Sequence, residues 1–206
     1  MRLYAQCLRK TGDVNGHINL LLKLLTHRSE ISPVDGKQYV DELEQDLQQS
    51  TSSILSHLVQ LIILAREGPL RDYFILQIGA RAFHRQNQDG FTINLHLTNL
   101  FPSTITLAKV TLKVTSVLTG QELYFTASNV PLSPGKNEIQ TTCNITAPGV
   151  YIFERVSLYW HSLVFQQEFV EMGRKQSVSL YPHGNALHVS AEMAGESIPP
   201  NYGNES

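Results

Sequence analysis

The chain has 206 residues, of which 42% are hydrophobic and 17% charged, proportions typical of a globular protein with one or two domains. Sixteen basic and eighteen acidic side chains give a net charge of -2 without a run of five like charges, which argues against a nucleic-acid groove and against a surface held to lipid by charge alone. Two cysteines do not support a disulfide framework, and no apolar stretch is long enough to cross a bilayer, so we expect a soluble, cytoplasmic protein with no transmembrane segment.

The first third of the chain places apolar residues at helical spacing. Gly12 suits the C-terminal cap of one helix, and Asp13 suits the N-terminal cap of the next. The pattern therefore predicts an antiparallel helical hairpin with a very short turn. Its two apolar stripes are Leu3, Tyr4, Cys7 and Leu8, and then Val14, Ile18, Leu21, Leu22 and Leu25.

Two further helices are predicted before residue 66. Ser32, followed by Pro33 and Asp35, is typical of a capped helix start. The apolar face of this third helix consists of Tyr39, Val40, Leu43 and Leu47, and a weaker, β-branched pattern for a fourth consists of Ile54, Leu55, Leu58, Val59 and Ile62. Such helix pairs bury their faces by stacking on neighbours, so residues 1–66 are predicted to be helical hairpins at the end of an α-solenoid, in a piece of a longer protein.

Beyond Asp72 the apolar residues alternate with polar ones, which is the period of a half-buried strand. Turn-forming residues separate the strand candidates. These are residues 73–83, 91–100, 104–118, 122–130, 137–145, 150–160 and 163–169. About seven short strands at this spacing predict an immunoglobulin-like sandwich over residues 70–182. The fold class is therefore α+β by segments, first helical and then all-β.

Two of the predicted strands are irregular. The apolar parity slips at Ala108 and Lys109, which predicts a bulge there or the true start of that strand. Residues 150–160 are apolar on both parities, which predicts a central strand covered on each face, by the opposite sheet and by another domain or partner. Residues 183–206 are rich in Pro, Gly, Asn and Ser, and we predict that they form a linker or a disordered tail.

Motifs for catalysis or cofactor binding do not occur in the sequence. The eight histidines lack zinc spacing, so we interpret them as scattered surface or strand-end residues. Nucleophile elbows and glycine-rich phosphate loops are also missing, and Cys143 is interpreted as a core thiol because it lies on the inward parity of its strand. The sequence therefore predicts no catalytic residue, no cofactor and no metal, and it favours a binding or scaffold module over an enzyme.

The candidate site residues lie in two Pro-Gly turns and at one strand end. Pro134-Gly135 and Pro148-Gly149 predict turns in which glycine adopts a conformation that a side chain would oppose. Tyr151 is predicted to act as a tyrosine corner, with its hydroxyl bonded to the backbone near the preceding turn. Tyr159 and Trp160 are candidates for a partner interface, and core packing is the stronger interpretation for Trp160.

Two motifs link the chain to a known family. VPLSPGKNEI (residues 130–139) is followed by PGVYIFER (148–155), in the pattern V-x-L-x-P-G-x-N-x-I and then P-G-x-Y-x-x-x-R. Together with the helical stretch YAQCLRKTGDVNGHINLLLKLL and the linker PLRDYF, they make the chain resemble the subunit 10 family of the TRAPP (transport protein particle) complexes, large subunits of the TRAPP II vesicle tether. The matching positions are Val130, Leu132, Pro134, Gly135, Asn137, Ile139, Pro148, Gly149, Tyr151 and Arg155.

This resemblance implies an immunoglobulin-like region after an α-solenoid, in a scaffold subunit of a tether that activates a Rab GTPase by nucleotide exchange. The implied partners are other TRAPP subunits and, indirectly, a Rab GTPase and the Golgi or endosomal membrane. The implied location is the cytoplasm, peripheral at the Golgi, near the trans-Golgi and early endosome. Exchange in the family is attributed to small core subunits, so no catalytic residue is transferred to this chain.

Two other functions stay open on the sequence. A free-standing immunoglobulin-like adaptor would bind a peptide or protein partner through a sheet edge by strand addition. An enzyme or a carbohydrate-binding domain would need a convergent cluster of polar groups in a deep pocket.

Overall fold

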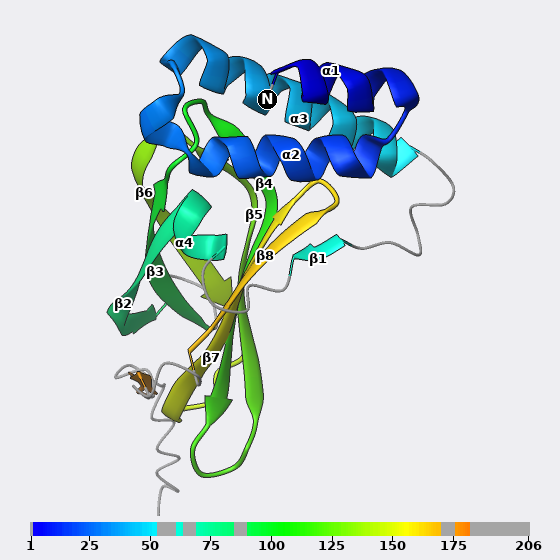
Figure 1. Cartoon of the computed structure of the whole chain (residues 1–206). Helices are drawn as coiled ribbons and strands as arrows, with labels where there is room; N and C mark the ends of the chain where they lie inside the picture. Colours follow the sequence, from blue (N-terminus) through cyan, green and yellow to red (C-terminus); the bar gives the residue numbers. More distant parts are fainter. Residues whose placement is uncertain (1, 53–60, 64–68, 85–89, 170–175, 182–206) are drawn as a thin grey trace, which may run out of the picture.

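Three helices form a layer at one end of a β-sandwich in the computed structural model, which describes residues 2–52, 61–63, 69–84, 90–169 and 176–181 (Figure 1). The helices are α1 (Arg2–Thr11), α2 (Val14–Thr26) and α3 (Pro33–Ser52), and a short 3-10 helix, η1 (Arg28–Glu30), precedes α3. These helices are the first three that the sequence predicts.

The predicted caps fix where two of these helices begin. The Asp13 carboxylate accepts a hydrogen bond from the backbone N–H of Gly16 at 2.9 Å, in the first turn of α2. Ser32 Oγ likewise accepts from the N–H of Asp35 at 3.1 Å, and Pro33 is the first residue of α3. Both side chains satisfy N–H groups that have no partner within the helix, which stabilises each helix start by about 1 kcal/mol.

The fourth predicted helix falls mostly outside the described residues. Its last member, Ile62, lies in β1 (Leu61–Ile63), a three-residue strand that pairs parallel to β8. The helical prediction is wrong at this residue, because β-branched side chains fit a pleated strand at least as well as a helix. Further along the chain, one helical turn, α4 (Pro69–Tyr73), leads directly into the sandwich.

The sandwich contains the seven predicted strands, with ends that differ from the prediction by at most two residues. They are β2 (Phe74–His84), β3 (Phe91–Asn99), β4 (Ile105–Ser116), β5 (Glu122–Leu132), β6 (Gly135–Cys143), β7 (Gly149–Trp160) and β8 (Leu163–Glu168). A short strand that the sequence does not predict, β9 (Ser177–Leu180), continues beside β7 where β8 has ended.

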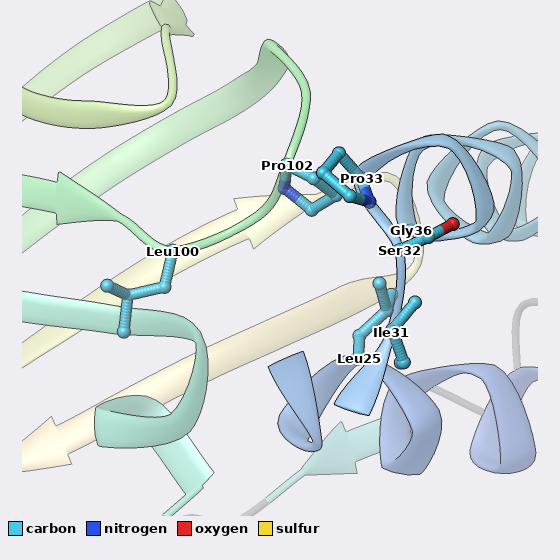
Figure 2. A pocket seen from close by; sticks show the side chains of 7 residues that line it. All are labelled: Leu25, Ile31, Ser32, Pro33, Gly36, Leu100 and Pro102. Atoms are coloured by element: carbon cyan, nitrogen blue, oxygen red, sulfur yellow. The ribbon is translucent and has the colours of Figure 1, made fainter. Parts of the chain in front are cut away.

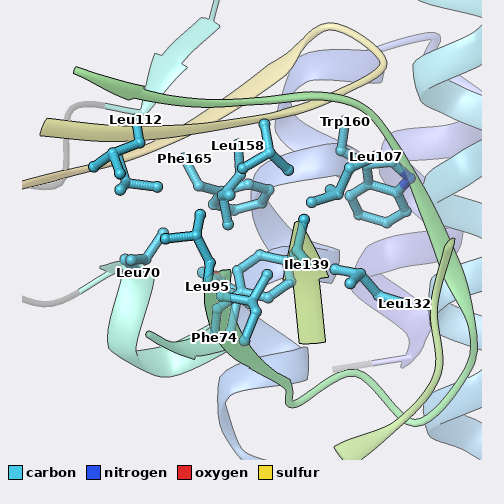
Figure 3. Close-up of a cluster of buried hydrophobic side chains, with 14 of the residues drawn as sticks. Leu70, Phe74, Leu95, Leu107, Leu112, Leu132, Ile139, Leu158, Trp160 and Phe165 are labelled. Carbon is cyan, nitrogen blue, oxygen red and sulfur yellow. The ribbon is translucent and has the colours of Figure 1, made fainter. Parts of the chain in front are cut away.

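The strand order is that of an immunoglobulin-like sandwich. β2, β3 and β6 form one sheet, and β5, β4, β7 and β8 form the other, with every one of these neighbours antiparallel. The two sheets join where β5 and β6 share the single pair Thr126 and Thr142 among the described residues. Apolar side chains from both sheets meet between them, Leu95 and Ile139 from one and Leu112 and Leu158 from the other (Figure 3).

A bulge in β7 explains why residues 150–160 are apolar on both parities. Lys113 of β4 pairs with Arg155, but the next residue, Val114, pairs with Phe153, so Glu154 is an extra residue in β7. Because one extra residue reverses the alternation, side chains on either side of the bulge turn to the same core. The buried members are Tyr151 and Phe153 before it, and Val156, Leu158 and Trp160 after it. The bulge therefore accounts for the apolar residues on both parities, and Val150 on the other face is 43% exposed in this chain.

The parity slip in β4 has a different cause. Leu107 pairs with Val130 and Lys109 pairs with Ser128, so the register between β4 and β5 stays constant across the slip. In both strands the buried side chains change from one parity to the other at the same level. Asn129 of β5 lies at this level, and its φ is 52°. The predicted bulge is wrong, because no residue is inserted: the two strands distort together.

Candidate functional site

The first Pro-Gly turn is built around Asn137. Its Nδ2 donates to the carbonyl oxygens of Ser133 and Gly135, both at 2.8 Å, and its Oδ1 accepts from the N–H of Ser133 at 3.0 Å. Gly135 has φ of 93°, the left-handed conformation predicted for it, while Pro134 is exposed. Asn137 therefore closes the connection between β5 and β6, which makes this half of the motif a framework element.

The second Pro-Gly turn is held by Tyr151. The Tyr151 side chain is 1% exposed, and its hydroxyl donates to the carbonyl oxygen of Ala147 at 3.0 Å, the hydrogen bond predicted for a tyrosine corner. Gly149 has φ of 154° at the start of β7, beside the exposed Pro148. Burial raises the pKa of the Tyr151 phenol, so the hydroxyl is held in its neutral, donating form.

Substitution of Tyr151 by phenylalanine tests this corner. We expect Tyr151→Phe to lower the free energy of unfolding by about 1 kcal/mol, because the ring packing stays while the hydrogen bond to Ala147 is lost. Urea denaturation followed by fluorescence measures the change. Tyr124→Phe is the matched control, because the Tyr124 hydroxyl bonds Glu122 at an exposed site. Equal losses in the two variants would contradict a special role for the corner.

The two aromatic candidates at the end of β7 point to opposite faces. Trp160 is 0% exposed and lies against Phe101, with ring centroids 5.3 Å apart, so the structure gives it a core position. Tyr159 lies on the outer face of the sheet, half-buried, between Lys109 of β4 and Val164 of β8. Of the two residues, only Tyr159 has exposed area that a partner could contact.

A charged cluster lies around the bulge on the outer face of the same sheet. Lys113 Nζ is 2.7 Å from Glu122 Oε1 and 2.8 Å from Glu154 Oε2, and Tyr124 donates to Glu122 at 2.7 Å. The hydrogen bonds from Lys113 lower the pKa of both carboxyls, and the same bonds raise the pKa of Lys113. Arg155, the last residue of the family motif, is half-buried beside them and adds positive charge that also favours ionised Glu122.

Acid should weaken this cluster. Because the pKa of Glu154 is lower in the folded chain than its ordinary 4.5, the stabilisation is present above that pH and is lost as pH falls through the folded-state value. We expect Glu154→Gln to cost less than about 1 kcal/mol near neutral pH, since the pair is partly exposed and screened, and to cost nothing in acid. Urea unfolding at several pH values measures this.

A double-mutant cycle supplies the control for the acid prediction. In the Lys113→Met background the Glu154→Gln change should have no further effect at any pH, because its partner is already missing. An undiminished pH-dependent effect in that background would show that Lys113 is not the cause.

One histidine differs from its predicted setting. His17 is 2% exposed between α2 and α3, with Nδ1 2.5 Å from Asp46 Oδ2 and Nε2 3.9 Å from Glu42 Oε2. The surface interpretation is wrong for this residue, because the helical hairpin turns it toward a buried carboxylate that the sequence pattern does not reveal. Among the residues that the structure describes, no group of three His, Cys, Asp or Glu side chains is arranged to hold a metal ion.

A shallow cavity of about 180 Å³ lies where the helical layer meets the sandwich (Figure 2). Its lining is apolar apart from Ser32, whose hydroxyl already caps α3. The lining residues are Leu25, Ile31, Ser32, Pro33, Gly36, Leu100 and Pro102. The convergent polar cluster that an enzyme would need is not found at this cavity.

Asn99, at the end of β3, has a structural role that the sequence pattern does not reveal. It is 2% exposed, and its Nδ2 donates to the carbonyl oxygens of Ser103 at 3.2 Å and Leu132 at 3.1 Å. Its Oδ1 accepts from the N–H of Phe101 at 3.0 Å. Asn99 thus ties the β3–β4 connection to the end of β5. A polar residue before the turn sequence Phe101-Pro102-Ser103 is the only sequence signal for this role.

Comparisons with known proteins agree with this fold. The family model described as TRS130-like, immunoglobulin-like domain matches residues 72–192, more than half of the chain. The search of curated proteins found no match to the chain. The matched range covers the sandwich, both Pro-Gly turns and Tyr151. Within the described residues no helix is long and apolar enough to cross a membrane. The chain belongs to the family of TRS130-like immunoglobulin-like domains, and TRS130 is a subunit of the TRAPP II complex.

Proposed function

We propose that this chain is a scaffold or tethering segment of a TRAPP-type complex in Golgi vesicle-mediated transport. It supports nucleotide exchange on a Rab GTPase without catalysis of its own. The observation that carries the proposal is the family match over residues 72–192, which is a match to a scaffold-type domain. The motif residues agree with it, since the polar groups of Asn137 and Tyr151 bond backbone carbonyls of the two turns.

The partners in this proposal are other TRAPP subunits, with a Rab GTPase and the Golgi or endosomal membrane engaged through them. The protein then acts in the cytoplasm, peripheral at the trans-Golgi and early endosome. Family membership supports these partners, because TRAPP subunits work in complexes.

We further propose that residues 1–66 are the end of an α-solenoid. Residues 70–182 form the immunoglobulin-like sandwich that follows it, and residues 183–206 form a linker or a disordered tail. The exposed side of α1 supports the solenoid. Tyr4 is 60% exposed and Cys7 is exposed, although both belong to the apolar stripe of that helix. A preceding helix would cover this stripe, as in stacked helical repeats.

Co-purification tests the assembly. A tagged chain at native expression should bring down small TRAPP subunits, and failure to recover any of them would contradict the proposal. Tyr159→Ser should reduce recovery, because Tyr159 is the one of the two aromatic residues at the end of β7 that lies on the outer face. Tyr124→Ser on β5 is the matched control, because Tyr124 is also a partly exposed tyrosine on the same sheet.

A free-standing adaptor is the second candidate function, and the β5 edge favours it. Among the described strands, β5 pairs along its length with β4 but meets β6 at one residue pair only, so backbone groups of β5 beyond that pair face away from the sheet. Such an edge can accept an extended peptide. A titration followed by NMR would then shift resonances of β5 alone, whereas shifts spread over the sandwich would exclude strand addition.

A further inference from the structure

The α4 turn, which lies between the helical layer and the sandwich, is packed into the sandwich core like the interior of one domain. Tyr73 of α4 stacks on Phe101, with ring centroids 5.5 Å apart and planes at 16°, and Phe101 in turn lies against Trp160. Phe74 and Phe165 complete the group, with centroids 5.3 Å apart. None of these five aromatic side chains is more than 7% exposed. Four of these rings come from the sandwich strands and the β3–β4 connection, so the group fixes Tyr73, and with it α4, in the sandwich core.

A buried hydrogen bond crosses the junction. The Tyr73 hydroxyl donates to the carbonyl oxygen of Leu22, in α2, at 3.0 Å. Leu22 is 4% exposed, so loss of this bond would leave a buried carbonyl oxygen without its partner. The bond therefore fixes the position of α4 against α2.

The helices and the sandwich also approach closely at the rim of the junction. A methyl group added at Gly36 of α3 would lie 3.1 Å from Pro102 Cγ, on the β3–β4 connection. Pro33, at the start of α3, and Pro102 both line the shallow cavity at this point (Figure 2). The close approach leaves no layer of water between Gly36 and the sandwich.

The apolar core is continuous from the helices into both sheets. Leu21 and Leu25 of α2 and Leu43 and Leu47 of α3 belong to the same cluster of buried side chains as the junction aromatics and the sandwich interior. No more than 4% of any of these four leucines is exposed. Separate folding units would instead show two clusters with a polar boundary.

We propose that the helical layer and the sandwich unfold as one cooperative unit and that the Tyr73 side chain connects them. The family match begins at residue 72, so this unit extends beyond the matched domain into α2 and α3. The sandwich is consequently held at a fixed orientation to the helices, and the α4 turn is not a hinge. This proposal rests on the contacts of the junction and is independent of the proposed function.

Unfolding of the full chain, followed by two probes, tests the proposal. The helical band of far-UV circular dichroism reports on α1, α2 and α3. In a Cys7→Ser background, Cys143 of β6 is the remaining thiol, and because it is 4% exposed its labelling reports on the sandwich. Both probes should give the same urea midpoint. A helical midpoint below the labelling midpoint would overturn the proposal.

Substitutions in one layer sharpen the test. Leu43→Ala lies in α3, away from the sheets, and should lower both midpoints equally, by about 1 M urea or more. Tyr73→Phe is the milder variant in case Leu43→Ala does not fold, and it should shift both midpoints together by a smaller amount. Lys37→Ala, an exposed change in α3, is the control and should shift neither. A variant that lowers the helical midpoint alone would show two independent units.

Discussion

Gly90→Ala should lower the free energy of unfolding by about 3 kcal/mol or more, the largest effect that we expect from the addition of a single methyl group. Gly90 precedes β3 with φ of 114°, a conformation that residues with a side chain rarely adopt. A Cβ at this position would also overlap the carbonyl oxygen of Cys143 and lie 2.9 Å from Asn144 Cα. Backbone atoms cannot move aside as the end of a flexible side chain can. Urea denaturation measures the loss.

Gly135→Ala separates the two causes of that loss. Gly135 also has a positive φ, 93°, but a Cβ there would have no atom within 4 Å. We expect this control to cost about 1 to 2 kcal/mol from backbone strain alone. If both variants lose the same stability, the close approach of Gly90 to the end of β6 contributes nothing, contrary to the structure.

Asn99→Ala should lower the free energy of unfolding by about 2 to 4 kcal/mol. The substitution removes three hydrogen bonds and leaves buried backbone groups of Phe101 and Leu132 without their partner. An unsatisfied buried polar group costs more than the bond itself contributes. The change is measured by urea denaturation, with the slope of the transition checked for two-state behaviour.

Asn94→Ala is the matched control for Asn99. Asn94 lies on the same strand and bonds Glu138 Oε1 at 2.8 Å, but at an exposed site. We expect its loss to be below about 1 kcal/mol. An Asn94 variant as unstable as the Asn99 variant would mean that burial of the side-chain hydrogen bonds does not set their contribution.

The sequence alone predicts the elements that depend on interactions between residues close together in the chain. The caps of α2 and α3 depend on a side chain and a backbone N–H three residues later, and the seven strands depend on alternation and on turns. The tyrosine corner is also predictable, since Tyr151 bonds a carbonyl only four residues away. Such interactions require no knowledge of which distant segments meet.

Features that depend on distant pairing are not predictable in this way. The extra residue Glu154 in β7 is visible only against the register with β4, so the sequence alone does not show that apolar residues of both parities face one core. The same holds for His17, whose partner Asp46 is 29 residues away, and for Asn99, which reaches Leu132 at a separation of 33. Alternation alone indicates on which face of a strand a side chain lies, but not which distant residue it contacts.

The outer charged cluster lies between these two cases. Lys113 and Glu122 are close in sequence and belong to one hairpin, so their pairing depends only on the register of β4 and β5. Glu154 joins them only because the bulge turns its side chain to the same outer face. Knowledge of one hairpin register is therefore enough to infer the pair of Lys113 and Glu122, but not the contact with Glu154.

The parallel pairing of β1 with β8 has a mechanical consequence. Residues 61–63 lie beside residues 163–165 and run in the same direction. When tension pulls the N-terminal side of β1 away from the C-terminal side of β8, the two strands slide along each other, so the bonds between them are strained together instead of one after another. This short pair therefore encloses the chain between β1 and β8, and a load applied across its two ends would act on it in shear.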